Sequence, residues 1–262
     1  MNPTLNMSTD APSEANTPLA LNDRVLAAVK TMPSSGHYKT SPEAFAALQR
    51  AIVTDQSGHL LLLPDQAKPN FCSEATYVIF LAVLNQLNHE DRLPLTPAVV
   101  QALLVKNQED GSRVWGRWNA NGPGTARLFH ELKLGRNFTS FEEAKPGDFL
   151  KIFWTEKIGA EEFGHSVVHL GSSGGNGSEE MVTFWSSNVP DGFGHKAVPK
   201  SKIKRAIFSR LENPLAISDV TNLPPRDEYL AAMLRRPSTE EEAFMMVGIP
   251  PSSVNRVSAE SR

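Results

Sequence analysis

The chain has 262 residues, 40% of them hydrophobic, so it is long enough to bury the core of one large domain. Its net charge of −3 argues against a nucleic-acid-binding protein, which usually carries a basic surface. No run of ~18 to 20 apolar residues is present, which argues against a membrane span.

The first twenty residues are polar and contain proline and serine, so we expect residues 1–20 to be disordered. They lack a basic start and an apolar segment, and the sequence as written therefore predicts no signal peptide. The protein then either stays in the cytoplasm or leaves it by another route.

Helical patterns fill the chain up to about residue 134. Asn22 is expected to cap the first helix, and Ser41 followed by Pro42 is expected to begin the second. Residues 59–63 form either a short buried strand or a further helical turn. The expected helices cover residues 22–30, 42–54, 72–84, 97–107 and 125–134.

From Lys145 onward the pattern changes to strands, and helices followed by an antiparallel meander predict an α+β domain over residues 21–212. Asp148 ends a Pro-Gly-Asp turn, which its side chain is expected to fix. Residues 213–262 predict a helical C-terminal appendage without chemistry of its own. The expected strands are 149–154, 165–170, 181–187 and 203–211, and the appendage helices are 227–235 and 239–247.

Cys72 is the only cysteine, so an intramolecular disulfide is excluded. A lone cysteine is more often a small buried hydrophobic residue than a nucleophile. This one, however, follows the loop Lys68–Phe71 and opens a long apolar helix. A helix N-terminus carries partial positive charge and free N–H groups, which favour a thiolate. The position therefore predicts a catalytic nucleophile.

His165 opens an apolar strand downstream and is the candidate general base. Side chains alternate along a strand, so His165, Val167 and His169 share one face, and that face is expected to look at the Cys72 helix. His169 would lie about 13 Å further along, too far to serve the same thiolate. The same distance argues against a metal site on the two histidines, and neither metal nor cofactor is expected.

A histidine base needs an acceptor at its second ring nitrogen. Asn188 and Ser186 share a face of the next strand, and Asn188 is preferred because an amide oxygen accepts cleanly. An asparagine that merely ends a strand remains the alternative. The oxyanion hole is expected to use the backbone N–H of Cys72 and the side chain of Gln66.

The segment Trp115–Gly124 combines two tryptophans, two asparagines and three glycines. A loop of this composition is costly to order, so it is a candidate wall of a substrate cleft. A structural turn packed by its own tryptophans is the alternative. The candidate substrate-binding residues are Trp115, Trp118, Asn119 and Asn121.

Three motifs together resemble the NlpC-like branch of the papain-like cysteine peptidases and amidases: Phe71-Cys72-Ser73, the Pro-Gly-Asp strand of residues 144–153, and the His165 strand of residues 164–171. The resemblance covers roughly residues 70–188. It implies a papain-like domain that cleaves amide bonds, typically in peptidoglycan stem peptides, through a thioester intermediate. The chain reads Phe-Cys-Ser-Glu where that family usually has Asp-Cys-Ser-Gly.

Two other functional readings stay open. The same dyad could serve an acyltransferase or a peptidase that acts on proteins, and only the reaction products separate these. A non-catalytic binding module could keep the fold without the activity, and its thiol would then be alkylated slowly at neutral pH.

Overall fold

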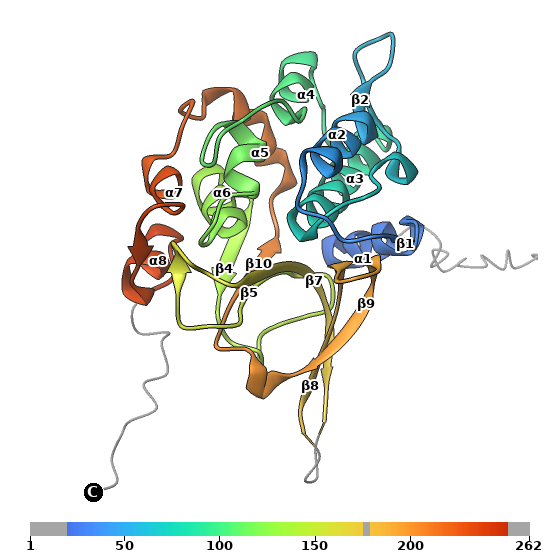
Figure 1. Ribbon diagram of the computed structural model, residues 1–262. Helices are drawn as coiled ribbons and strands as arrows, with labels where there is room; N and C mark the ends of the chain where they lie inside the picture. Colours follow the sequence, from blue (N-terminus) through green and yellow to red (C-terminus); the bar gives the residue numbers. More distant parts are fainter. Residues whose placement is uncertain (1–19, 175–178, 251–262) are drawn as a thin grey trace, which may run out of the picture.

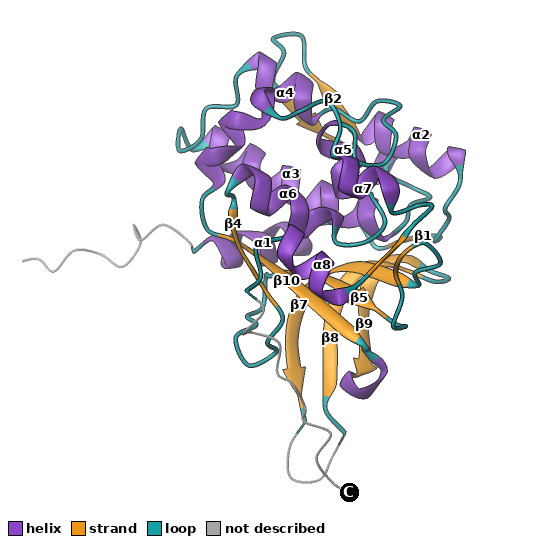
Figure 2. Cartoon of the chain, turned by 90° about the vertical axis from the view of Figure 1, so that its left-hand side faces the viewer, coloured by secondary structure: helices purple, strands orange, loops and turns teal. Residues whose placement is uncertain are grey.

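The computed structural model describes residues 20–174 and 179–250, in which helices gather on one side of an antiparallel sheet (Figures 1 and 2). The predicted α+β class is confirmed. Residues 1–19, to which the expectation of disorder applied, lie outside the described residues. No helix in the described part of the chain is long and apolar enough to cross a membrane.

Two helices of the first half begin where a short polar side chain accepts from a backbone N–H of the first turn. Ser41 accepts from the N–H of Ala44, and Thr96 caps its helix in the same way. The expected Asn22 cap is wrong, because the first helix begins after Ala20 without a side-chain cap. The helices are α1 (Leu21–Thr31), α2 (Pro42–Ala51), α3 (Cys72–His89), α4 (Pro97–Leu103), α5 (Arg113–Trp118) and α6 (Gly124–Leu132).

Helix α2 is shorter than expected. It ends at Ala51, and the next three residues form β2 (Ile52–Thr54), which pairs with β3 (Leu60–Leu62). The β-branched residues Ile52 and Val53 favour this strand over a further helical turn. The strand alternative for residues 59–63 is therefore confirmed, and the short helix η2 (Pro64–Gln66) follows it.

The main sheet has the order β1-β9-β8-β7-β5-β10-β4, and its neighbouring strands are antiparallel. Of the four expected strands, β5, β7 and β8 lie side by side as a meander, but the fourth, β10, returns to pair with β5 instead of following β8. The sequence pattern missed β9 and β4, which are rich in Gly and polar residues. The strands are β1 (Ser35–Gly36), β4 (Gly135–Phe138), β5 (Phe149–Phe153), β7 (Gly164–Ser173), β8 (Met181–Asn188), β9 (Gly192–Pro199) and β10 (Arg205–Leu211).

Each face of the sheet contributes to a different core. One face packs Phe149, Val168 and Trp185 against the helices, with α3 buried nearly all round at the centre. The sheet is curled (Figure 1). On its other face Val167 and Phe184 pack with Phe138 and Phe208 in a second core. Which face of the sheet a side chain lies on therefore determines how it can reach the beginning of α3.

The C-terminal segment packs on the domain. Residues of its last helix join Phe153 and Ile207 in a third buried cluster, and its short strand pairs with β6 (Ile158–Gly159). Asp227 and Thr239 cap its two helices through their side chains. Its elements are η4 (Pro214–Asn222), α7 (Glu228–Ala232), β11 (Pro237–Ser238) and α8 (Glu240–Met246), and η3 (Lys200–Lys202) precedes β10.

Candidate active site

Cys72 is the first residue of α3, where an anchored loop turns into the central helix. The Phe71 N–H donates to Glu74 Oε2 at 3.1 Å, which satisfies one backbone donor at the helix start. The Asn70 carbonyl accepts from Ser187 Oγ at 3.0 Å, which ties the loop to the sheet. The half-buried thiol therefore lies at the positive end of a fixed helix.

His165 and Asn188 form a hydrogen-bonded pair beside this thiol. His165 Nε2 lies 3.1 Å from Asn188 Oδ1. The Asn188 amide nitrogen donates to the carbonyls of Ser186 at 3.2 Å and Gly194 at 2.9 Å, which orients Oδ1 toward the ring. In the neutral imidazole Nε2 then carries the proton, and Nδ1 is the nitrogen left to face Cys72 as base.

The surroundings of the sulfur favour its thiolate. Burial raises the pKa of Cys72, but the hydrogen bond and charge of His165, the Ser166 backbone N–H and the Lys151 charge lower it to about 7. Lys151 is held by an ion pair in which its Nζ lies 2.7 Å from Glu162 Oε1. A substantial share of Cys72 is therefore a nucleophilic thiolate at neutral pH.

His165 reaches Cys72 from a face of β7 that differs from the expected one. His165 and Val167 do share a face, but this face looks into the second core, where Val167 is buried. The face that packs on the helices carries Val168. His165 contacts the thiol because it is the second residue of its strand and Cys72 the first of its helix, so the two meet at the rim of the sheet.

Tyr38 is a further contact of the thiol that the sequence did not reveal. Its hydroxyl hydrogen-bonds with Cys72, and its backbone N–H donates to the Pro190 carbonyl at 3.0 Å. Burial, followed by the Cys72 charge, raises the pKa of Tyr38 well above its ordinary value. The phenol therefore stays protonated and acts as a hydrogen-bond donor beside the sulfur.

Glu74 places a buried carboxyl in the first turn of α3. Burial raises the pKa of Glu74 to about 9, the Phe71 N–H opposes this shift, and the Cys72 charge adds to it. Oε1 of this side chain has no hydrogen-bond partner in the described part of the chain. Glu74 is therefore neutral at pH 7 and adds no second negative charge beside the thiolate.

Gln66, the expected side-chain donor of the oxyanion hole, lies on η2 with its side chain exposed. No hydrogen bond joins this side chain to another described residue. The Cys72 N–H remains available at the helix start, and Tyr38 is the hydroxyl that lies at the sulfur.

The two tryptophans proposed to line a substrate cleft lie in the core instead, because residues 113–118 form α5 rather than a loop. Trp115 and Trp118 are each 1% exposed, and both rings pack against Tyr77. Buried rings cannot contact a substrate, so this expectation is wrong. The alternative was right that the tryptophans are structural, but they belong to a helix and not to a turn.

The asparagines that follow α5 support the beginning of α3 and a neighbouring loop. Asn119 Oδ1 accepts from Ser73 Oγ, next to the nucleophile, and Trp118 Nε1 donates to the Ser73 carbonyl at 3.1 Å. Asn121 Nδ2 donates to the Gly159 carbonyl at 3.5 Å. Asn119 thus helps to position Cys72 through its hydrogen bond with the next residue, Ser73.

The competing candidates for base and orienter lie elsewhere. His169 is buried in the second core against the Phe208 ring, and burial lowers its pKa. Ser186 Oγ donates to the Ser166 carbonyl at 2.7 Å and makes no hydrogen bond to His165. Of these polar side chains, the structure brings Asn188 to the His165 ring.

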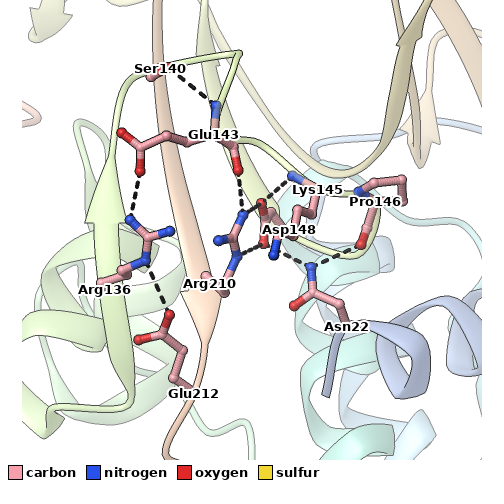
Figure 3. Close-up of polar contacts among 9 residues, drawn as sticks. All are labelled: Asn22, Arg136, Ser140, Glu143, Lys145, Pro146, Asp148, Arg210 and Glu212. Atoms are coloured by element: carbon pink, nitrogen blue, oxygen red, sulfur yellow. Dashed lines mark hydrogen bonds and ion pairs between the residues drawn. The ribbon is translucent and has the colours of Figure 1, made fainter. Parts of the chain in front are cut away.

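Asp148 fixes its turn and joins three parts of the chain (Figure 3). Its carboxylate accepts from the Lys145 N–H at 2.7 Å and from Asn22 Nδ2 of α1 at 2.9 Å. Arg210 of β10 donates to both of its oxygens, from Nε at 2.8 Å and from Nη2 at 2.7 Å. The carboxylate is fully buried, so its role is structural, as the sequence predicted.

Sequence reasoning missed two residues that act on Cys72, Tyr38 through a hydrogen bond and Lys151 through its charge. Tyr38 follows a Ser- and Gly-containing segment that matches no motif. Lys151 could have been found from strand alternation, because it shares a face with Phe149 and is a cation inside an otherwise apolar strand. Comparison with protein-family models, curated proteins and solved structures finds no match to this chain.

Proposed function

We propose that the chain is a cysteine hydrolase with Cys72 as nucleophile, His165 as base and Asn188 as orienter. The observation that carries the proposal is the His165 ring, which hydrogen-bonds with the Cys72 thiol and lies 3.1 Å from Asn188 Oδ1 through Nε2. A thiol, an imidazole and a fixed acceptor in this order are the components of nucleophilic acyl transfer.

In the proposed reaction, His165 takes the Cys72 proton and the thiolate attacks the carbonyl carbon of an amide. The carbonyl oxygen becomes an oxyanion, which the Cys72 N–H and the Tyr38 hydroxyl stabilise. As the C–N bond breaks, His165 passes its proton to the leaving amine, and a thioester remains. Water, deprotonated by His165, then attacks the thioester, which releases a carboxylic acid and restores the thiol.

We further propose a papain-like arrangement, supported by the order of its parts along the chain. The cysteine begins a central helix, the histidine opens a strand, and the asparagine ends the next one. Amide bonds of peptidoglycan stem peptides are the substrate class that the resemblance of the motifs implies. A cell-wall substrate would also require export of the protein.

Product analysis tests the reaction. Purified protein is incubated with peptidoglycan fragments, and new amine and carboxylate ends are identified by mass spectrometry. We expect cleavage by the wild type and none by Cys72→Ala, since removing a nucleophile costs a factor on the order of 10⁴ or more in rate. Equal cleavage by both proteins would refute the nucleophile assignment. Transfer of the acyl group to an added amine would identify an acyltransferase instead.

Alkylation separates a catalytic thiol from a binding module without any substrate. We expect iodoacetamide to label Cys72 with a midpoint near pH 7, in line with its pKa of about 7. A free thiol has its midpoint near ~8.5. A wild-type midpoint at or above that value would favour the non-catalytic module.

A further inference from the structure

A surface cleft of about 370 Å³ lies directly against the His165 ring. It is formed on the face of β7, β8 and β9 that turns away from α3. His165 packs edge-on against Phe184, with ring centroids 5.6 Å apart. The wall of the cleft contains two large apolar side chains that the fold leaves exposed to solvent. Phe163 is 65% exposed and Val189 is 63% exposed. Its apolar lining residues are Trp154, Phe163, Phe184, Val189 and Val198.

The charged residues that line this cleft are both lysines, Lys196 and Lys202, apart from the titratable His165 and Tyr38. Both lysines are exposed, and neither forms an ion pair with a described carboxylate. Five lysines outside the cleft have such partners, Lys39, Lys68, Lys151, Lys157 and Lys200, whereas Lys30 and Lys106, like the cleft lysines, have none among the described residues. The cleft therefore offers an apolar floor and an unsatisfied positive charge, which complement an apolar anion.

The position of the cleft beside His165 indicates which half of the amide substrate it would bind. In the proposed reaction His165 gives its proton to the leaving amine, so the group bonded to that amine must lie beside the ring. Lys196 stands opposite Phe184 on β9, two strands away from His165. The distance across two strand spacings, from His165 to Lys196, is therefore ~10 Å. A ligand of two extended residues spans about 7 Å, and the flexible lysine side chain can bridge the remaining distance.

We propose that this cleft binds the leaving-group half of the amide substrate, and that this half is an apolar dipeptide with a free C-terminal carboxylate that pairs with Lys196 and Lys202. The inference rests on the proposed function, since it uses His165 as the proton donor. It adds the substrate class: short peptides cleaved near an apolar, carboxylate-bearing end.

Binding can be measured without turnover in Cys72→Ala. Trp154 lines the cleft, whereas Trp115, Trp118 and Trp185 are buried in the core, so a change in tryptophan fluorescence reports the cleft. The probes are the dipeptide Phe-Leu and its C-terminal amide. We expect Phe-Leu to change the fluorescence and to bind at least about 10-fold more tightly than the amide, because only the former offers a charge-assisted partner.

A matched pair of charge variants in the Cys72→Ala background completes the test. Lys196→Gln with Lys202→Gln should weaken Phe-Leu binding to the level of the amide. Lys30→Gln with Lys106→Gln removes the same charge elsewhere and should leave binding unchanged. Equal affinity for acid and amide, an unaltered affinity in the cleft variant, or no fluorescence change would each overturn the inference. None of these results depends on the thiol, whereas slow alkylation of Cys72 with intact dipeptide binding would refute the proposed function alone.

Discussion

Replacing Glu74 by glutamine should make the protein more stable at alkaline pH than the wild type. Burial raises the pKa of this carboxyl from 4.5 to about 9, so the folded protein keeps its proton where the unfolded chain has lost it. The stability that the neutral carboxyl contributes is therefore complete below pH 4.5 and is lost as the pH rises toward 9. Glutamine is neutral throughout and keeps an oxygen that can accept from the Phe71 N–H.

The size of the effect follows from the linkage between protons and folding. Between the two pKa values, each pH unit removes about 1.4 kcal/mol from the free energy of unfolding of the wild type. From pH 5 to pH 8 the wild type should therefore lose about 4 kcal/mol relative to Glu74→Gln. This is a large share of the ~5 to 15 kcal/mol that holds a domain folded.

Urea unfolding at pH 5, 6, 7 and 8, followed by circular dichroism, measures this difference. Glu241→Gln, at an exposed glutamate of α8, is the matched control and should follow the wild type at every pH. A gap between wild type and Glu74→Gln that stays constant with pH would refute a neutral Glu74. Because the neutral carboxyl leaves the thiolate undisturbed, Glu74→Gln should also keep the wild-type rate of Cys72 alkylation at pH 7.

The remaining predictions concern the residues around the thiol. His165→Ala should abolish peptide cleavage and move the alkylation midpoint of Cys72 toward ~8.5, whereas His169→Ala should lower the urea midpoint and leave the alkylation midpoint in place. Asn188→Ala should lower kcat by about 10 to 100-fold, and Asn188→Asp by less, because a carboxylate still accepts from Nε2. Tyr38→Phe should lower kcat by about 100-fold with little change in KM, as expected for a donor to the oxyanion. Full activity of either Asn188→Ala or Tyr38→Phe would remove that residue from the mechanism.

Features set by neighbouring residues were predictable from the sequence. Ser41 before Pro42 marks the beginning of α2, because a hydroxyl at this position accepts from the first turn whatever surrounds it. The beginning of α3 at Cys72 and the strand that contains His165 follow from the apolar runs behind them. Asn188 was found because it ends the strand after the histidine strand and carries an amide oxygen that can accept a hydrogen bond.

Features set by tertiary packing were not predictable. Trp115 and Trp118 stand among glycines and asparagines, which suggested a loop, but burial of two large rings against Tyr77 outweighs the poor local propensity. Strand alternation also cannot tell which face of β7 meets the helices, and the expected face was the wrong one. Tyr38 reaches Cys72 only through the fold, from 34 residues earlier in the chain.

The arrangement around Cys72 explains why a glutamate can follow so closely behind a nucleophile. A thiolate and a carboxylate two residues apart in the first turn of a helix would repel each other. Burial resolves this conflict by keeping Glu74 protonated, while His165 and Lys151 supply positive charge to the sulfur alone. The site can therefore hold one anion at neutral pH, and the geometry assigns that anion to Cys72.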